Sequence, residues 1–556
     1  MHPTIGASTE GDPLLSTMQD VDLSITSLFR HGQRVHRRSK VLTYDGTGFH
    51  TVTFGEVAER TERLAGALRR LGIVHGDRVA TLMWNTSEHV EAYFAIPGIG
   101  AVVHTLNLRL FPDQLIHIVN EAADRVIIVH ATVTPVLAKV ASELIGVEHV
   151  IVVDDGVPVA PELGAAFDSV LAYEELLAAE EPGFDWPPID ERSAAAMCYT
   201  SGTTGDPKGV VYSHRSTFLH AFAVNNAASS MVFSERERAL VIVPMFHVNA
   251  WGYPYVCWMN GADMVMPSRF LQGEPIAQMI AKARPTVSAG VPTIWGSLLA
   301  YVDEHPDTDL SSIKCLNSGG AALPPSMIER FDRLGVRIIQ GWGMTETSPI
   351  CALSEPPVQE NADSVEWRAR TGRIVPGVEI RIVTDSGEIA PWDGRATGEI
   401  EVRGPWITGS YYQDPAEEKF HDGWLRTGDI GSIDDYGFIQ ISDRVKDVIK
   451  SGGEWISSVA LETELAGHPE VAEASVVGVA DERWTERPLA VVVRRSDSQI
   501  SAEALAAWLK ERVPSWWVPE RWSFVAELPK TSVGKFDKKQ IRSSEKEGSL
   551  EVERLG

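Results

Sequence analysis

The sequence predicts an α/β protein with a large N-terminal domain of doubly wound sheets, a small β-barrel-like subdomain and a small, mobile C-terminal α+β domain. Three observations predict it. Helical and strand-like segments alternate from residue 21 to about 190 and again from 239 to 340, which is typical of parallel sheets covered by helices. Strand-like alternation dominates between residues 378 and 402, and the pattern changes again after Asp443.

The first elements follow from the spacing of apolar residues. Residues 54–71 have apolar positions at helical spacing, whereas 78–84 and 125–129 are short apolar runs that fit buried strands. Residues 379–383 and 399–403 alternate between charged and apolar side chains, with Pro-Gly and Gly-Pro pairs beside them. These two runs predict a small antiparallel sheet or barrel.

The C-terminal region has its own strands and helix. Residues 474–479 and 490–493 are strand-like, and 502–512 predict a helix with Ser501 as its N-cap. We expect the first 20 residues or so to be a loose lead and the charged stretch from Ser543 to be frayed. The 556 residues are enough for about three or four folding units. The predicted division is an N-terminal domain over 1–442, a hinge at 443–447 and a mobile C-terminal domain over 448–556.

Composition excludes several classes of protein. The net charge of −26 disfavours nucleic-acid binding, which needs a basic surface. The four cysteines are far apart and contain no CxxC pair, which argues against a zinc site or a disulfide framework. No signal peptide and no apolar run of about 18 residues is apparent. We therefore expect a cytoplasmic protein without a transmembrane segment, and peripheral membrane contact is left open.

One segment carries a clear chemical signal. Residues 199–209 combine three glycines, four hydroxyl side chains and a lysine. Glycines let main-chain amides approach phosphates closely, and hydroxyls add donors or Mg²⁺ ligands. The segment lacks the Gly-Lys-Ser/Thr of a Walker A loop, and its bland alternative is a flexible surface loop. The candidate phosphate-binding residues are Thr200, Ser201, Gly202, Thr203, Thr204, Gly205 and Lys208.

This segment resembles the phosphate-binding loop of the adenylate-forming superfamily, which includes acyl-CoA synthetases, luciferases and nonribosomal adenylation domains. The resemblance covers nearly the whole chain, because five further stretches resemble the family's motifs in order. Residues 245–251 and 450–458 are most similar to dimeric bacterial medium- and long-chain fatty-acyl-CoA synthetases, which implies a homodimer. The five stretches are 244–251, 317–322 with 340–347, 424–429, 443–455 and 529–535.

The resemblance implies roles for individual residues. Lys535, His247 and Glu346 would be catalytic, and Glu346 with Thr200 would hold Mg²⁺. His247, Val248 and Trp251 would line the acyl pocket, and Gly452 and Gly453 would approach CoA. Trp342 stands where the family often has tyrosine, and its indole offers at least as much stacking area. The remaining ATP- or AMP-binding residues would be Gly320, Gln340, Gly341, Trp342, Thr345, Asp429, Arg444, Lys446, Lys450 and Trp455.

Each of these residues could instead have no role in the reaction, for example as a surface glutamate, an aspartate in a turn, a solvated lysine or a tryptophan packed in the core. The chemistry nevertheless fits, because attack of a carboxylate on the α-phosphate needs neutralised charge. The resemblance implies that ATP and a carboxylic acid give acyl-AMP, which CoA then converts to acyl-CoA. A medium- or long-chain fatty acid is the expected acid. Alternatives are a short-chain, aromatic or sulfur-containing acid, a carrier protein loaded in trans, a luciferase-like oxygenase or a non-catalytic binder.

Overall fold

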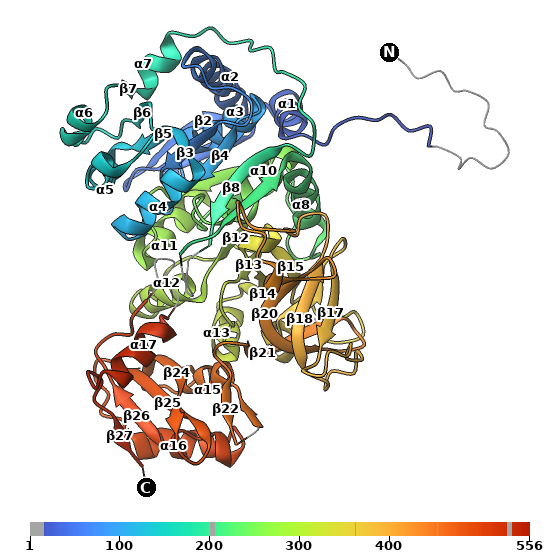
Figure 1. The fold of residues 1–556 in the computed structure, drawn as a ribbon, viewed down its shortest axis with the longest axis vertical. Coiled ribbons are helices and arrows are strands. Elements are labelled where there is room, and N and C mark those ends of the chain that lie inside the picture. Colours follow the sequence, from blue (N-terminus) through green and yellow to red (C-terminus); the bar gives the residue numbers. More distant parts are fainter. Residues whose placement is uncertain (1–15, 201–205, 362, 453, 531–535, 556) are drawn as a thin grey trace, which may run out of the picture.

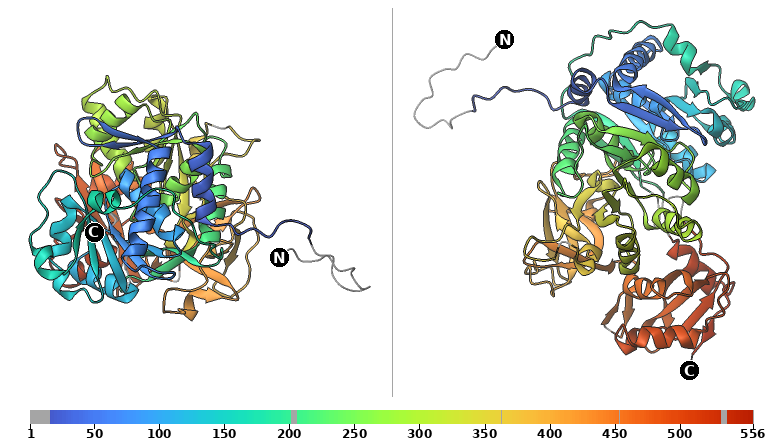
Figure 2. Two further views of the ribbon diagram at one scale, coloured as in Figure 1. Left: turned by 90° about the horizontal axis from the view of Figure 1, so that it is seen from above. Right: turned by 180° about the vertical axis from the view of Figure 1, so that it is seen from behind.

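The computed structural model describes residues 16–200, 206–361, 363–452, 454–530 and 536–555. Three sheets organise these residues. Two of them pack together in the upper part of Figure 1, and the third forms a separate unit at the lower end with the C-terminus. The view from behind in Figure 2 shows the same division. The predicted combination of a large N-terminal α/β domain with a smaller C-terminal one is confirmed.

The first sheet is parallel except for its last strand. Its order is β7-β6-β5-β3-β4-β8-β9, and only β9 runs antiparallel to its neighbour. Long runs of valine and isoleucine suit strands that are buried on both faces. The strands are β3 (Arg78–Leu82), β4 (Val102–Thr105), β5 (Asp124–His130), β6 (His149–Val153), β7 (Val170–Ala172), β8 (Ala194–Tyr199) and β9 (Gly209–Ser213).

The second sheet changes character along its length. Strands β10 to β14 pair in parallel, and β14 then pairs antiparallel with β15, so the antiparallel strands extend the parallel sheet through β14. The antiparallel part contains the predicted runs at 379–383 and 399–403. Its strands are β1 (Lys40–Tyr44), β2 (Phe49–Thr53), β10 (Arg238–Leu240), β11 (Asp263–Met266), β12 (Val287–Gly290), β13 (Cys315–Ser318), β14 (Arg337–Gly343), β15 (Ile350–Leu353), β16 (Gly372–Ile374), β17 (Glu379–Val383), β18 (Gly398–Arg403), β19 (Phe420–His421), β20 (Trp424–Ile433) and β21 (Phe438–Arg444).

Helices fill the space between and around these two sheets. The largest core contains residues from both, and Trp258 lies at its centre with its indole stacked on Phe54 at 4.3 Å between ring centroids. The helices are α1 (Ile25–Val35), α2 (Phe54–Arg70), α3 (Ser87–Gly98), α4 (Pro112–Ala122), α5 (Thr134–Ala138), α6 (Glu162–Ala166), α7 (Tyr173–Ala178), α8 (His214–Asn226), α9 (Val248–Trp251), α10 (Tyr253–Asn260), α11 (Gly273–Ala283), α12 (Pro292–Glu304), α13 (Pro325–Arg333) and α14 (Val365–Ala369).

The C-terminal unit has its own sheet and its own core. Its order is β23-β22-β25-β26-β27, with β24 paired to β25, and its core includes the buried Trp522. The elements are β22 (Ile449–Ser451), β23 (Glu454–Ile456), α15 (Ser458–Ala466), β24 (Val471–Asp481), β25 (Thr485–Arg494), α16 (Ala502–Lys510), β26 (Arg521–Phe524), α17 (Lys538–Lys546) and β27 (Glu553–Arg554).

Several of the predicted helices and strands are present in the structure. The expected helix at 54–71 is α2, and the expected strands at 78–84 and 125–129 are β3 and β5. Ser501 caps α16, because its side chain accepts a hydrogen bond from Ala504 N–H. The expected fraying after Ser543 is wrong: α17 continues to Lys546 and β27 pairs with β26. Ile541 packs into a core despite its charged neighbours.

Within the described ranges, no helix combines the length and the apolar character that crossing a membrane requires. The four cysteines are buried and unbridged.

Histidine 89 generates a prediction about acid stability. Its Nδ1 donates to the Trp84 carbonyl and its Nε2 accepts from the Thr81 hydroxyl, both at 2.9 Å, so the buried ring is fully bonded when neutral. Burial lowers the pKa of His89 to about 4. In the unfolded chain a histidine has a pKa near 6.5, so the unfolded state binds a proton that the folded state does not. The free energy of unfolding therefore decreases as the pH falls from about 6.5 towards 4.

We expect His89→Gln to flatten this dependence. Between about pH 7.5 and 5.5, the wild-type chain should lose about 1 kcal/mol more unfolding free energy than the variant does. Urea unfolding followed by circular dichroism at the two pH values measures the difference. The exposed His31→Gln serves as the control. Equal losses in wild type and His89→Gln would contradict the assignment.

Candidate active site

A cavity of about 890 Å³ lies where the two large sheets meet. Most of the candidate residues that the structure describes line it, and they come from stretches far apart in the sequence. The candidates among its lining residues are Thr200, Lys208, His247, Val248, Trp251, Gly320, Gly341, Trp342, Thr345, Glu346, Arg444 and Lys446. Gln340, Asp429, Lys450, Gly452 and Trp455 are not lining residues. Ser201, Gly202, Thr203, Thr204, Gly205, Gly453 and Lys535 lie outside the described residues.

The predicted phosphate-binding loop leaves β8 and returns into β9. Thr200 N–H donates to the Lys208 carbonyl at 2.9 Å, and Lys208 N–H donates to the Thr200 hydroxyl at 3.0 Å. These two bonds close the base of the loop. The Lys208 ammonium forms an ion pair with Asp414 at 2.8 Å and lies 5.1 Å from the centre of the Tyr411 ring. The cation is thereby held at the cavity wall.

The predicted adenine segments form the ends of β13 and β14. Gly341 allows close approach here, since a Cβ at this position would lie 2.8 Å from the Asn317 side chain. Trp342 lines the cavity and donates its indole N–H to Asp429 at 2.9 Å. Gln340 instead faces the interior, where its side-chain carbonyl accepts from Leu323 N–H at 2.6 Å. Its observed contact thus supports the neighbouring loop.

Asp429 is the predicted ribose ligand, and it is 3% exposed. One carboxylate oxygen accepts the Trp342 indole N–H, and the other pairs with Arg444 Nε at 3.0 Å. The Asp429 carboxylate is the main reason why the pKa of Arg444 is raised. Arg444 ends β21 at the predicted hinge, so this ion pair joins the nucleotide segment to the hinge.

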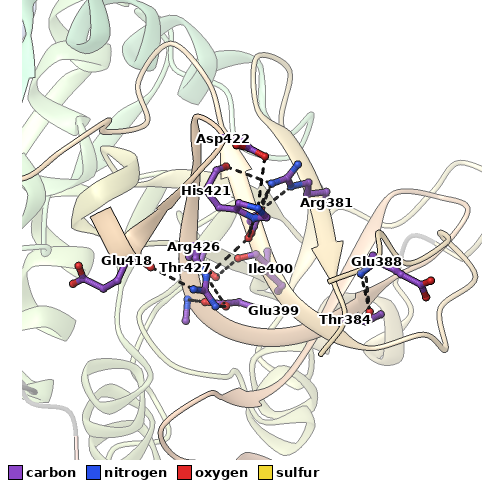
Figure 3. A network of polar contacts seen from close by, with 12 residues as sticks. Arg381, Thr384, Glu388, Glu399, Ile400, Glu418, His421, Asp422, Arg426 and Thr427 are labelled. Carbon is purple, nitrogen blue, oxygen red and sulfur yellow. Dashed lines mark hydrogen bonds and ion pairs between the residues drawn. The ribbon is translucent and has the colours of Figure 1, made fainter. Parts of the chain in front are cut away.

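The main chain just before Asp429 takes part in the polar network of Figure 3, which includes Thr427, Arg426 and Glu399. Thr427 donates its hydroxyl to the Ile400 carbonyl at 2.8 Å. The same hydroxyl accepts from Asp429 N–H at 3.1 Å. Glu399 accepts from Arg426 Nε at 2.9 Å and from Gly428 N–H at 3.2 Å. A contact to β18 and a contact within β20 therefore fix the Gly428 and Asp429 main-chain N–H groups.

Glu346 lies on a single helical turn after β14 and is 8% exposed. The Tyr411 hydroxyl donates to its carboxylate at 2.7 Å, and its main-chain carbonyl accepts from Thr408 N–H at 2.8 Å. Burial and the Glu346 charge raise the pKa of Tyr411, which therefore stays a donor. The carboxylate and the Thr200 hydroxyl line the same cavity and are both hard oxygen ligands of the kind that Mg²⁺ prefers.

Those two oxygens fit a metal that also binds a substrate phosphate. Within the described residues, no group of three or more His, Cys, Asp or Glu side chains is placed to hold a metal ion. Mg²⁺ commonly uses one or two protein carboxylates together with phosphates and waters. The donor set around Glu346 is therefore compatible with Mg²⁺ carried in by ATP.

The acid side of the cavity is built on an unusual turn. Val248, Asn249, Ala250 and Trp251 have φ angles of 46°, 50°, 51° and 56°, so α9 is a left-handed turn that begins directly after His247. Val248 and Trp251 line the cavity together with residues from α8, the loop after it, α10 and β15. These apolar lining residues are Val224, Met231, Val248, Trp251, Tyr253, Ile350, Ala352 and Leu353.

The remaining nucleotide candidates Lys446, Lys450 and Trp455 and the CoA candidate Gly452 lie at and beyond the predicted hinge. Burial is the main cause of the lowered pKa of Lys446, which lines the cavity. Lys450 pairs with Trp455 across β22 and β23, away from the cavity lining. Gly452 has a φ of 62°, and a Cβ there would lie 2.6 Å from the Trp484 indole. Lys450, Gly452 and Trp455 are therefore not part of the cavity lining, whereas Lys446 lines the same cavity as Trp342 and Glu346.

Several residues around the cavity escaped the sequence analysis. Tyr411 contacts Glu346, Asp414 contacts Lys208, and Glu399 contacts the Gly428 main chain. Each partner is at least 29 residues away in the chain. No local sequence pattern marks such long-range partners. The one available signal was that Tyr411 and Asp414 lie between residues 340–347 and 424–429, two stretches that resemble motifs of the family.

Comparisons with known proteins agree with this arrangement. Residues 29–412 match the family described as AMP-binding enzyme, and residues 460–535 match the AMP-binding enzyme C-terminal domain. A 3-methylmercaptopropionyl-CoA ligase of Ruegeria pomeroyi is 41% identical over 535 residues, which are 95% of this chain and 98% of that protein. A long-chain-fatty-acid–CoA ligase of Thermus thermophilus is also 41% identical, over 96% of this chain and 97% of its own.

A solved structure gives the same result in three dimensions. The anthranilate CoA ligase AuaEII in complex with anthranoyl-AMP aligns with a TM-score of 0.83 at 25% identity, covering 95% of this chain and 98% of that one. The family match extends over more than half of the chain, and the relatives align over nearly their full length. This chain belongs to the AMP-binding enzyme family.

Proposed function

We propose that this protein is an ATP-dependent carboxylate–CoA ligase that acts on a medium- or long-chain fatty acid. One observation carries the proposal: a single cavity is lined both by nucleotide candidates, such as Trp342 and Glu346, and by His247 with several apolar side chains. A carboxylate bound at His247 would lie beside the phosphates of ATP. Adenylation replaces hydroxide, a poor leaving group, with AMP, a good one.

The residues would divide this chemistry as follows. Trp342 would stack on adenine, Asp429 would accept the ribose hydroxyls, and the loop from Thr200 to Lys208 would bind the phosphates. His247 would orient the acid carboxylate. Glu346 and Thr200 would hold Mg²⁺, which when bound neutralises charge on the phosphate oxygens. Lys535 would contact the α-phosphate during adenylation, and Gly452 and Gly453 would admit the CoA thiol after the C-terminal domain turns about Lys446.

We also propose that the chain divides into two domains at a hinge over residues 443–447. The protein is further proposed to be a cytoplasmic homodimer. Support for the division comes from the separate core of the C-terminal unit and from Arg542, which pairs with Asp447 at 2.9 Å beside the hinge. Support for the dimer comes from the resemblance to dimeric synthetases.

The apolar lining supports the choice of acid. Eight apolar side chains surround this end of the cavity, and relatives of Thermus thermophilus and Ectopseudomonas oleovorans are named as long- and medium-chain-fatty-acid–CoA ligases. A shorter, sulfur-containing acid is the second candidate. Two Ruegeria relatives are named 3-methylmercaptopropionyl-CoA ligase. Within the lining of this cavity, the Tyr253 hydroxyl donates to the Met231 sulfur at 3.4 Å, so these two side chains contact each other.

Carboxylate-dependent exchange between ATP and pyrophosphate tests the proposal. We expect exchange with saturated fatty acids of medium or long chain, and thioester formation when free CoA is added. A panel of fatty, aromatic and methylthio acids ranks the candidates by kcat/KM. Exchange without conversion of free CoA would indicate a different acceptor, and ATP consumption that needs no acid would refute the ligase assignment.

Lysine 535 separates the two half-reactions. We expect Lys535→Ala to lose adenylation and to retain conversion of supplied acyl-AMP and CoA into thioester, because its cation is needed only at the α-phosphate. Lys530→Ala is a matched control, since Lys530 belongs to the same segment and pairs with Glu473 at 2.6 Å. Normal adenylation by Lys535→Ala would refute this role.

The contact between Tyr411 and Glu346 yields a further prediction. Tyr411→Phe keeps the ring beside Lys208 and removes the donor to the Glu346 carboxylate. We expect the Mg²⁺ concentration for half-maximal exchange to rise about tenfold, as is typical when a partner of a metal ligand is removed. Titration of exchange activity with Mg²⁺ measures this shift. The exposed Tyr436→Phe is the control, and an unchanged Mg²⁺ requirement in Tyr411→Phe would argue against Glu346 as a ligand.

A further inference from the structure

Beside the candidate active site, the Asn85 side chain makes the hydrogen bonds to residues 241–245 that a neighbouring strand would otherwise make. β10 ends at Leu240, and residues 241–245 lie outside any strand. The Asn85 side-chain amide donates to the carbonyls of Val241 and Val243 at 2.7 and 2.8 Å and accepts from Met245 N–H at 2.7 Å. Alternate residues of a segment present their polar groups to the same neighbour, as they do in a sheet. One amide thus satisfies three main-chain groups.

The three bonds connect the two large sheets. Asn85 follows β3 of the first sheet and is 3% exposed, whereas residues 241–245 extend β10 of the second. Two further contacts cross in the same direction. The Tyr93 hydroxyl donates to the Met245 carbonyl, and the Thr105 hydroxyl donates to the Phe246 carbonyl at 3.5 Å. The segment before His247 is therefore held by hydrogen bonds to residues in and next to the first sheet.

We propose that Asn85 is a positioning residue that sets where His247 stands in the cavity. The inference rests on the proposed function, in which His247 orients the acid carboxylate. His247 follows Met245 by two residues, and its N–H donates to the Pro244 carbonyl at 2.9 Å. The segment therefore turns tightly between the Asn85 contacts and the cavity, so a shift of Met245 displaces His247 and the left-handed turn after it.

The nucleotide side of the cavity does not depend on these bonds. Trp342 lies on β14 and Asp429 on β20; they bond to each other, and Asp429 also bonds to Arg444 and Thr427. Loss of the Asn85 amide should therefore weaken use of the acid and leave use of ATP nearly unchanged. A role in folding alone would not discriminate between the two substrates.

The substitution Asn85→Asp tests this inference. It keeps the size of the side chain and turns a carboxylate oxygen towards the Val241 and Val243 carbonyls, which repel it. The matched control is Asn120→Asp, because Asn120 also bridges main-chain groups, donating to the Glu143 carbonyl at 2.9 Å and accepting from Ile145 N–H at 2.7 Å, and lies outside the cavity lining. Steady-state exchange kinetics are measured for both substrates, with thermal midpoints alongside.

For Asn85→Asp we expect KM for the acid to rise, so that kcat/KM for the acid falls about tenfold to a hundredfold, the effect typical of a small misplacement, with KM for ATP within about twofold of wild type. Asn120→Asp should leave both values unchanged. Should Asn85→Asp fail to fold, Asn85→Ser retains a hydroxyl donor and is measured instead, with the same expectation. A lowered kcat with both KM values unchanged, or equal losses for ATP and acid, would overturn the inference. Acid-independent ATP use by the wild-type protein would instead refute the proposed function.

Discussion

The ion pair between Arg444 and Asp429 is the contact on which the arrangement of the whole site depends. Asp429 accepts the Trp342 indole on its other oxygen, so one buried carboxylate joins β14, β20 and the end of β21. The Arg444 side chain is 41% exposed whereas that of Asp429 is 5% exposed, so the pair matters chiefly because it compensates a nearly buried carboxylate and fixes its position. The candidate adenine, ribose and hinge residues consequently hold one another in place, and a rotation about residues 443–447 begins next to the nucleotide candidates.

Two other cations of the cavity also have acidic partners close by. Lys208 pairs with Asp414, and Arg426 pairs with Glu399, although the whole chain carries a net charge of −26. These ion pairs line a cavity and are partly exposed, so each contributes little stability. Their contribution is geometric, since they keep cationic groups at fixed places on the wall. A small anionic ligand can be bound by such local charges even though the protein is strongly acidic.

The sequence predicted elements well where a local pattern exists and poorly where a contact is long-range. Helix α2 and its neighbours follow from apolar spacing, and most of the candidate residues that the structure describes line one cavity because the motifs are compact. The fraying after Ser543 was wrongly predicted, because composition could not reveal that Leu550 and Val552 pack against a core and that β27 pairs with β26. Asn85 and Tyr411 were missed for a related reason: their partners lie 156 and 65 residues away.

The left-handed turn at 248–251 shows how those missed contacts matter. Four successive non-glycine residues at positive φ are disfavoured by about 1–2 kcal/mol each, and no propensity rule predicts such a turn. It persists because tertiary contacts determine it from several directions. Cys198 donates to the Asn249 side chain at 2.8 Å, and the Trp251 indole lies so close to Gly319 that a Cβ there would approach it to 2.8 Å. Strain of this kind is retained where the surrounding structure fixes a functional geometry. Here the turn follows His247 directly and brings Val248 and Trp251, which are three residues apart, to the wall of the same cavity.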